Sequence, residues 1–338
     1  MKGAARPDSG FSMIDLLVAM LLTIVVIGAA IGLANPHVLA SRVQPDAVDA
    51  QQRLRTAVDI LSRALYTAGA GVDAGTMAGP LGRFLPPVIP RRIGRAYQDA
   101  PTTPRQDAMT LVHVPASVSQ TALAAPLSTS VAALLALPGC PFARPACGLD
   151  RDDGVVVFDD LGHFDLFTVV ASAGMSADLR HRGRLGPYAF AAGSHAVEAD
   201  ARVYYFDAAQ QQLRVSDGDL TDQPAVDGIS HMAIEYFGSP LPPRFPQPAT
   251  GVANCLYDAA GVPNPALGVL PAGAGSLAAL PPALLGDGPW CGTRDTAFDA
   301  DTLRIRRVRI TLTAVAGRGA RRPSVTFDVA PRNLADQP

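Results

Sequence analysis

An apolar run near the start of the chain constrains its folding more than any other feature of the sequence. From Leu16 to Ala34 there are nineteen residues, and Thr23 is the only one with a polar side chain. At 1.5 Å per residue, a helix of this length spans roughly the 30 Å hydrocarbon thickness of a bilayer. The preceding residues 1–10 carry Lys2 and Arg6 against a single acid. By the positive-inside rule this side stays cytoplasmic, so the rest of the chain is expected on the exported side.

The residues in front of the apolar run form a candidate processing site. An ordinary secretory signal has a small-residue cleavage site after its apolar core, whereas here Gly10 precedes the core and no Ala-x-Ala follows it at once. Gly10, Phe11 and the acidic Asp15 resemble the class III signal of type IV prepilins and pseudopilins. The resemblance implies that a prepilin peptidase removes residues 1–10 by cutting between Gly10 and Phe11, and that Phe11 is then N-methylated. The family usually has glutamate where this chain has Asp15, so the charge is kept on a shorter side chain.

Asp15 needs a partner if it lies within an apolar environment. An ionised carboxylate inside a membrane segment costs a few kcal/mol unless it is paired or neutralised. In the family, the equivalent carboxylate meets the N-terminal amine of a neighbouring subunit, so the resemblance implies an assembly role for Asp15 with the amine of Phe11 as its partner. Two plainer interpretations stay open: Asp15 marks the water-exposed start of a transmembrane helix, or the segment is an ordinary signal anchor.

The helix is expected to continue beyond the membrane segment. Pro36 predicts a kink, after which Leu54, Val58, Leu61 and Leu65 recur at helical spacing and predict a face that packs on a globular domain. Gly69 and Gly71 predict the end of the helix. We therefore expect one long helix over residues 11–70, with a membrane anchor over about 16–34 and a soluble amphipathic half over 40–68. This organisation is similar to the N-terminal architecture of type IV pilins.

Four cysteines lie beyond the membrane segment, on the side expected to be oxidising. They are Cys140, Cys147, Cys255 and Cys291. Four cysteines allow three pairings, and the short spacing favours Cys140 with Cys147, which leaves Cys255 with Cys291. A zinc site is the alternative, but the cysteines lack paired Cys-x-x-Cys spacing and have no histidine at ligand spacing beside them.

Residues 71–338 predict a β-rich globular domain. The runs with strand character are Asp107–Val114, Gly154–Phe158, Phe164–Val170, Ala201–Phe206, Gln212–Ser216, Val226–Phe237, Leu303–Ala314 and Ser324–Ala330. Ala201–Phe206 and Gln212–Ser216 are expected to pair as a hairpin, and a break in alternation at Arg306 and Arg307 predicts a bulge. Residues 117–137 are ambiguous between helix and loop. Residues 238–300, rich in Pro, Gly and Ala, predict a long loop stapled by a disulfide.

The distal sequence carries a second, looser resemblance. The order of the hairpin, a polar loop, the step Val226-Asp227-Gly228-Ile229, a strand with a tyrosine, and a final strand followed by Arg332-Asn333 resembles PilW-like minor pilins. Together the two resemblances imply an α+β, type IV pilin-like fold. Its long N-terminal transmembrane and amphipathic helix would pack on an antiparallel β-sheet with long disulfide-stapled loops.

Composition and motifs argue for few other activities. The formal net charge of −2 gives no basic field that would attract nucleic acid. Asp217, Asp219 and Asp222, and likewise Asp150, Asp152 and Asp153, could hold calcium, but their spacing is not that of an EF-hand and turns favour Asp in any case. The arginines 304, 306, 307 and 309 could attract phosphate, but on a strand they are expected to face solvent. Because recognised catalytic and phosphate-binding motifs are absent from the sequence, we expect no enzyme, cofactor or metal.

The resemblance implies a minor pilin that initiates or caps a type IV pilus. Its partners would be the prepilin peptidase, the inner-membrane assembly platform, and other minor and major pilins bound through the N-terminal helix. It would span the inner membrane once, with a periplasmic C-terminal domain, and later lie at the cell surface or pilus base. The alternatives are a J-like pseudopilin at the tip of a type II secretion pseudopilus, a pilin-anchored adhesin that binds through residues 238–300, and a membrane-anchored periplasmic enzyme.

Overall fold

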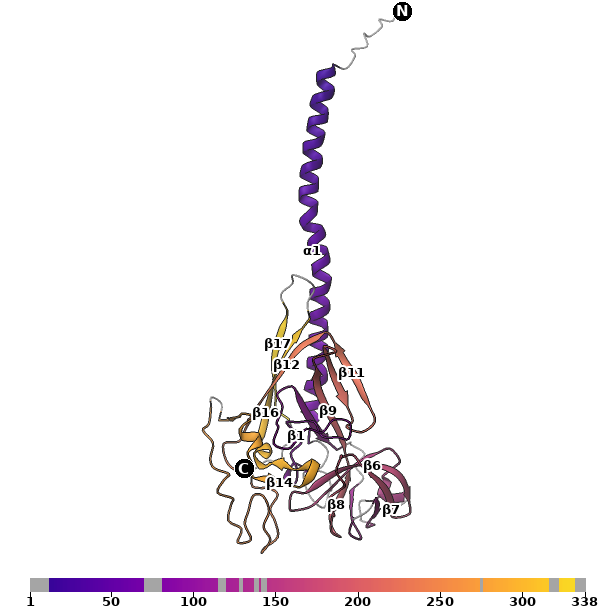
Figure 1. Cartoon of the computed structure of the whole chain (residues 1–338), viewed down its shortest axis with the longest axis vertical. Coiled ribbons are helices and arrows are strands. Elements are labelled where there is room, and N and C mark those ends of the chain that lie inside the picture. The colour runs from indigo at the N-terminus through magenta and orange to yellow at the C-terminus, as the bar shows by residue number, and fades with distance from the viewer. Residues whose placement is uncertain are drawn as a thin grey trace, which may run out of the picture.

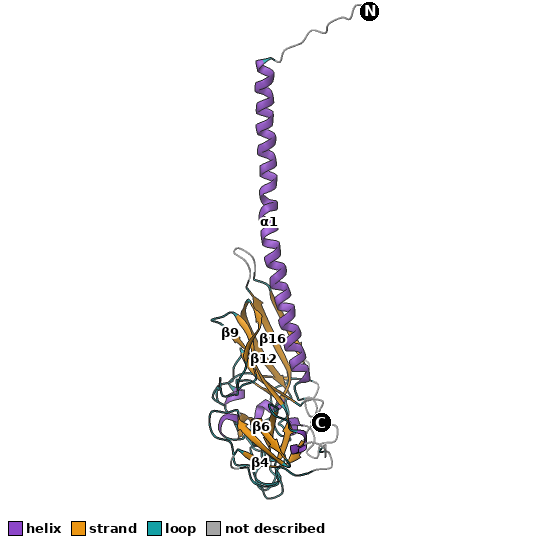
Figure 2. Ribbon diagram, turned by 90° about the vertical axis from the view of Figure 1, so that its right-hand side faces the viewer, coloured by secondary structure: helices purple, strands orange, loops and turns teal. Residues whose placement is uncertain are grey.

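The structure is a computed structural model that describes residues 12–69, 81–114, 120–127, 130–136, 140, 145–273, 276–315 and 322–331. Within residues 33–45 it describes the helical backbone but not the side chains. A long helix projects from a β-rich body, and its N-terminal half stands clear of that body (Figures 1 and 2). The chain is therefore α+β, with far more sheet than helix in the body.

Helix α1, Met13–Thr67, is a single element of 55 residues, about 80 Å long at 1.5 Å per residue. The helical assignment runs through Pro36 without interruption. It stops two residues before Gly69, whose φ of +74° lies in the left-handed region and whose N–H donates to Val112 O. This end agrees with the glycine signal in the sequence.

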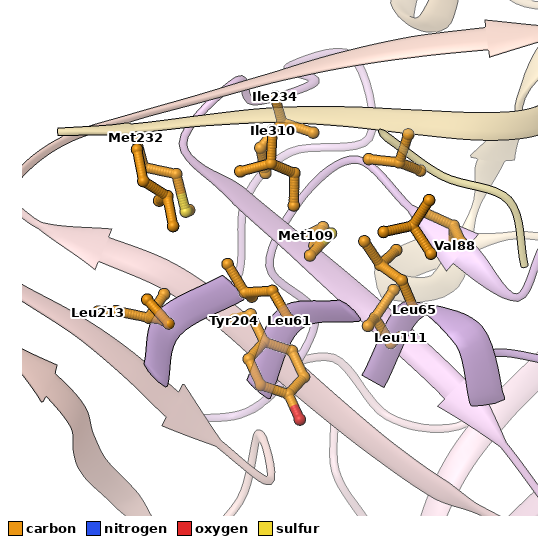
Figure 3. Close-up of a cluster of buried hydrophobic side chains, with 14 of the residues drawn as sticks. Leu61, Leu65, Val88, Met109, Leu111, Tyr204, Leu213, Met232, Ile234 and Ile310 are labelled. Carbon is orange, nitrogen blue, oxygen red and sulfur yellow. The ribbon is translucent and has the colours of Figure 1, made fainter. Parts of the chain in front are cut away.

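The second half of α1 packs on two antiparallel sheets. One has the order β1-β2-β9-β10-β11, and the other has the order β13-β12-β16-β17. Their bounds are β1 Val88–Ile89, β2 Ala108–His113, β9 Asp200–Asp207, β10 Gln212–Ser216, β11 Asp222–Asp227, β12 Ile229–Gly238, β13 Ala278–Leu280, β16 Ile305–Ala314 and β17 Ser324–Val329. Figure 3 shows Leu61 and Leu65 of the helix among the side chains of these strands.

The predicted stripe on the helix is buried. Leu54 is 5% exposed and Leu61 and Leu65 are fully buried, while Val58 packs at the margin of the same core. Their partners include Met109, Leu111, Ile234 and Ile310 from the sheets. The spacing of three and four residues puts these side chains on one face of α1. Burial of that face attaches the helix to the body.

The C-terminal strands largely follow the sequence expectation, with one correction. The hairpin of β9 and β10 is present. Val226–Phe237, expected as one strand, is instead divided between β11 and β12. The division falls at Gly228, where φ is +70° and a Cβ would lie 2.1 Å from Arg53 Nη1 of the helix. Glycine is favoured at this turn because its backbone lies in the left-handed region, and a side chain there would also displace the end of Arg53.

The predicted bulge in β16 is confirmed. Phe237 of β12 is opposite Arg307 and Gly238 is opposite Ile305, so Arg306 is the extra residue on β16. Its guanidinium donates to the carbonyls of Leu303 and Ile305. The expected start of this strand at Leu303 is wrong, because Leu303 and Arg304 belong to the short helix η5, Ala300–Arg304.

A separate module is inserted between β2 and β9. These strands are neighbours, with His113 opposite Asp200, and the intervening residues form a six-stranded sheet of order β3-β8-β5-β6-β7-β4. Its elements are β3 Gln120–Ala122, β4 Val131–Ala133, η2 Pro145–Gly148, β5 Gly154–Phe158, β6 Phe164–Ala173, β7 Ser176–His181 and β8 His195–Glu198. Residues 117–137, expected as helix or loop, therefore contribute two short edge strands.

A second inserted segment, the second excursion, lies between β12 and β16 in the sequence. The long loop expected over residues 238–300 contains β13 and also η3 Leu284–Gly286, β14 Trp290–Cys291, η4 Arg294–Thr296 and β15 Phe298–Asp299. A shared core joins this excursion to the module and to the segment that starts with η1, Leu81–Arg83. It includes Leu85, Phe158, Phe164, Leu256 and Phe298. Both insertions lie at the end of the body opposite the free half of α1 (Figure 1).

Candidate functional site

The free half of α1 is an apolar rod without packing partners among the described residues. Met13–Gly32 is long and apolar enough to cross a membrane, and none of it is buried inside the molecule. Ile14, Leu21 and Ile24 are 70%, 65% and 70% exposed. A continuous apolar surface of this extent is unfavourable in water and is stable only against lipid or other protein. By length and composition this segment is the candidate membrane span.

Ser12 and Asp15 cap the free end of the helix. Ser12 Oγ accepts a hydrogen bond from Ile14 N at 3.3 Å, and Asp15 Oδ2 accepts one from Ser12 N at 3.3 Å. These two residues form a capping box, which satisfies N–H groups that the first turn leaves without carbonyl partners. The negative charge also lies at the positive end of the helix dipole. Because Asp15 is exposed, its carboxylate is accessible to an external cation. Gly10 and Phe11 lie outside the described residues.

The outward face of the docked half of α1 is polar. Asp49 pairs with Arg53 at 2.5 Å and Asp59 pairs with Arg63 at 2.9 Å. Beside this face a groove of about 590 Å³ separates the helix from the edge strand β17. Leu54, Val58 and Val325 are among the residues that line it. The groove therefore has apolar side chains from both the helix and β17, between polar residues such as Gln51 and Asp59.

The structure pairs the cysteines in the way that the spacing favoured. Cys140–Cys147 closes a short loop in the inserted module, with Cα atoms 4.6 Å apart, and Cys255–Cys291 staples the second excursion, with Cα atoms 5.0 Å apart. All four thiols are consumed by these bonds, so none is available as a thiolate ligand for zinc. The disulfides fit a domain in an oxidising compartment.

The aspartates after β10 do not converge on one point. Asp217 Oδ1 accepts hydrogen bonds from Asp219 N, Leu220 N and Thr221 N, which closes the turn. Asp219 instead pairs with Arg180 at 2.6 Å. Asp222 faces a different set of partners, Arg214, Tyr205 and Tyr97. Burial alone would raise the pKa of Asp222. The hydrogen bonds from these partners together outweigh burial, so the pKa lies below its usual value. This geometry gives each carboxylate a structural partner.

The aspartates before β5 are also dispersed. Asp153 Oδ2 accepts a hydrogen bond from Asp150 N at 2.7 Å. The side chain of Asp152 is 82% exposed, and its Oδ2 lies 3.9 Å from Arg151 Nε. The backbone of Asp152 has a φ of +71°, which aspartate tolerates better than most residues. These positions are accounted for by turn formation.

A different acidic cluster lies in the second excursion, where sequence reasoning did not expect one. Carboxylate oxygens of Asp287, Asp299 and Asp301 lie within 4.8 Å of one another. Asp299 accepts N–H bonds from Gly288 and Asp301, and Asp301 accepts from Arg304. Burial raises the pKa of Asp299 to about 6. Asp299 and Asp301 are separated by one residue in the sequence, but only the fold brings Asp287 to them.

The arginine row at the start of β16 is not a uniform solvent face. Arg304 is 1% exposed and ties the excursion together through Asp301, Pro240 O and Gly268 O. Arg307 and Arg309 lie over the ring of Phe237 on the outer sheet face, with centroid distances of 4.7 and 5.1 Å. Arg309 also pairs with Asp328 at 2.7 Å. The expectation of a wet face is therefore wrong for Arg304, because the η5 helix turns it inward.

The two insertions are bound to each other by polar contacts, two of which involve buried carboxylates. Asp165 of the module accepts a hydrogen bond from Thr296 Oγ1 at 3.0 Å, and Asp295 accepts one from Leu185 N at 2.7 Å. Arg294 donates to Gly186 O at 2.7 Å. Asp165 and Asp295 are 2% and 7% exposed. Since unpaired polar groups would be costly at this burial, these bonds hold the insertions together as one end of the molecule.

Comparisons of the chain with protein-family models, with curated proteins and with solved structures found no match.

Proposed function

We propose that this chain is a minor pilin of a type IV pilus, of the PilW-like kind, that helps to initiate or cap the filament. The observation that carries the proposal is the division of α1 into an exposed apolar half and a half docked on an antiparallel sheet. The processing-site resemblance at Gly10 and Phe11 and the acidic residue in the first turn of the helix support it.

Assembly would exchange lipid for protein around the same surface. In the bilayer the apolar side chains of Met13–Gly32 contact acyl chains, and in a filament they contact equivalent helices of neighbouring subunits. Lipid and protein are similarly apolar, so packing and polar pairing decide the association. Asp15 supplies the polar pair by binding the N-terminal amine of Phe11 in a neighbouring subunit. The groove beside β17 offers that neighbour a further apolar contact lower on the helix.

The proposal requires a defined set of partners. A prepilin peptidase cuts after Gly10, Phe11 is N-methylated, and the inner-membrane assembly platform moves the chain into contact with other minor pilins and the major pilin. Before assembly the chain spans the inner membrane once, with the β-rich body in the periplasm. No turnover, cofactor or metal is needed for this role, because the work is done by packing.

Adhesion is a second candidate function, and the position of the insertions favours it. Both disulfide-stapled excursions lie at the end of the body away from the candidate membrane span (Figure 1). On a filament tip that end would face the surroundings. If deletion of residues 238–300 abolished attachment but left assembly intact, this role would be established. A neighbouring cluster of type II secretion genes would instead favour the J-like pseudopilin.

N-terminal sequencing of the exported protein tests the leading proposal. We expect the mature chain to begin at methylated Phe11, and an intact Met1 would refute the assignment. The substitution Gly10→Val should block processing, because a β-branched side chain does not fit a site that accepts glycine. Gly3→Val, within the same leader, is the matched control and should be processed normally. Normal processing of Gly10→Val would contradict the proposed cleavage site.

A further inference from the structure

A cleft of about 470 Å³ lies where the inserted module meets the five-stranded sheet. Its walls come from the start of β5, the residues that follow β7 and β8, and the β10–β11 turn. The module and the sheet meet below β9 in Figure 1. The cleft is thus built by segments far apart in the sequence, and it brings together residues of the two aspartate groups considered above as calcium ligands, Asp152 and Asp153 from one and Asp217 from the other.

The walls of the cleft are mainly acidic. The carboxylates that line it are Asp152, Asp153, Glu198, Asp200 and Asp217. Among the described residues the lining has two arginines against these five acids, Arg182 and Arg202, and Asp153 and Glu198 also have interactions of their own. Arg202 is already paired with Asp200 at 2.7 Å. The cleft therefore has a negative potential that favours cations and disfavours a simple anion.

Arg182 lies buried in this acidic cleft with part of its guanidinium unused. The residue is 7% exposed. Its Nε donates to Thr168 Oγ1 at 2.8 Å and its Nη1 donates to Asp217 O at 3.3 Å. Among the described residues no carboxylate oxygen lies within 4.0 Å of it, and its Nη2 group has no hydrogen-bond acceptor. Burial lowers the pKa of Arg182.

Gly154 makes the position of this guanidinium possible. A Cβ at Gly154 would lie 3.0 Å from Arg182 Nη2 and 2.2 Å from Ala199 O. Any side chain there would displace the arginine or the neighbouring strand. The glycine thus leaves the Nη2 group open to the cleft.

A buried cation without an ion-pair partner is costly, and a bound anion would offset that cost. A carboxylate suits it best, because a guanidinium can donate two parallel hydrogen bonds to its oxygens. The same anion would be repelled by the five acids around it unless it also brought positive charge. The arrangement therefore selects a ligand that has a carboxylate and cationic groups in one small molecule or chain end.

We propose that this cleft binds a cationic amino acid, either free or as the carboxy-terminal residue of a peptide. The α-carboxylate contacts Arg182, and the positive groups lie among the acidic side chains that line the cleft. The inference goes beyond filament assembly and does not depend on it, because the cleft is remote from the apolar half of α1. If Arg182 instead only ties the module to the Asp217 turn, it contributes to stability and to no binding.

Titration calorimetry on the full chain in detergent tests the proposal with matched probes. L-arginine should bind, and agmatine, which has the same guanidinium but no carboxylate, should bind at least about tenfold more weakly, as expected for loss of a charge-assisted hydrogen-bonded pair. Glycyl-glycyl-arginine and its C-terminal amide distinguish the two sources. Binding of the free-acid peptide but of neither its amide nor free arginine assigns a peptide end, whereas binding of free arginine but not of the peptide assigns the amino acid itself.

Arg182→Gln should abolish the preference for arginine over agmatine. The control is Arg184→Gln, two residues along, because Arg184 donates to Arg95 O and Ala96 O and does not line the cleft. The control should keep the preference. Equal binding of arginine and agmatine to the unaltered protein, no binding of any probe, or the same loss in Arg184→Gln would overturn the proposal. If Arg182→Gln does not fold, the arginine and agmatine comparison on the unaltered protein decides the question.

Discussion

At the scale of single residues, Asp15 carries both a local and a proposed intermolecular role. In the structure its carboxylate accepts the N–H of Ser12 and completes the helix cap. In the proposed filament it would bind the amine of a neighbouring Phe11. The two roles are compatible, because a carboxylate has two oxygens and accepts several hydrogen bonds.

Asp15→Ala should therefore insert in the membrane and assemble poorly. Removal of the charge makes insertion easier, whereas loss of the ion pair should lower the amount of the chain in sheared filaments by about tenfold or more, from a pair worth a few kcal/mol. Immunoblotting of membrane and filament fractions measures both effects. Asp15→Glu keeps the charge and should restore assembly. Wild-type incorporation of the alanine variant would show that the carboxylate has no assembly partner.

Asp299 gives a second prediction at this scale, through pH. Burial raises its pKa from 3.8 to about 6, so between these values the folded state binds more protons than the unfolded state. Its contribution to stability is thus largest below about pH 4 and is lost as pH rises through 6, by up to about 3 kcal/mol. Asp301 acts in the same direction.

Denaturant unfolding of the full chain in detergent at pH 4 and pH 7 measures this dependence. Asp299→Asn should make the protein more stable at pH 7 relative to pH 4 than the unaltered protein is, because the variant no longer has a carboxyl whose ionisation is opposed by burial. Asp46→Asn, at an exposed position on α1, should leave the difference unchanged. An unaltered pH difference in Asp299→Asn would show that this carboxyl titrates normally in the folded protein.

At the scale of elements, α1 is held to the body by one stripe of side chains. Leu61 is fully buried among residues of both sheets, whereas Val48 on the same helix is 62% exposed. The docked half of α1 sets the direction in which the apolar half leaves the body (Figure 1). Weak docking would therefore affect both stability and the geometry of assembly.

Leu61→Ala should lower the unfolding free energy by about 2–5 kcal/mol, the usual cost of a Leu-to-Ala change in a core. Val48→Ala should change it by less than about 0.5 kcal/mol, because the side chain is mostly in solvent. Chemical denaturation in detergent followed by the fluorescence of Trp290 and by circular dichroism compares the two variants. Equal effects of both substitutions would contradict the packing described for α1.

At the scale of the whole molecule, two insertions form the end opposite the candidate membrane span, and each has a disulfide. Cys140–Cys147 closes a separation of 7 residues and Cys255–Cys291 one of 36. In the chain-entropy account, a disulfide that closes a longer loop lowers the entropy of the unfolded chain more and therefore stabilises the folded state more. The second bridge should therefore contribute more to the stability of this end.

Replacement of both Cys255 and Cys291 by alanine should cost about 4 kcal/mol, and replacement of both Cys140 and Cys147 about 2.5 kcal/mol. Thermal unfolding of the two double variants, without reductant, measures the order. Neither pair lies in the core that docks α1, so membrane insertion should persist in both variants. A larger loss for the short loop would show that local strain, and not loop entropy, dominates.

How much of the fold could be predicted depended on the range of the interactions involved. The stripe on α1, the β9–β10 hairpin and the bulge at Arg306 were predictable, because each is written in spacings of a few residues. Residues 117–137 were not, because β3 and β4 are short edge strands whose partners, β8 and β7, come more than forty residues later. Arg304 was placed on a solvent face because strand alternation cannot reveal a helical turn that ends at that residue.

The sequence by itself determined that the chain has one apolar helical rod joined to an amphipathic one, because hydrophobic periodicity acts within a single element and needs no partner to be read. The sequence spacing also favoured one of the three possible cysteine pairings, Cys140 with Cys147 and Cys255 with Cys291, which is the pairing in the structure. Only the tertiary structure decided that two insertions share one end of the body, that Asp287 joins Asp299 and Asp301, and that Arg182 faces an acidic cleft. These features arise where segments that are far apart in the sequence come together. The burial and charge of a residue there depend on neighbours that a local sequence pattern cannot reveal.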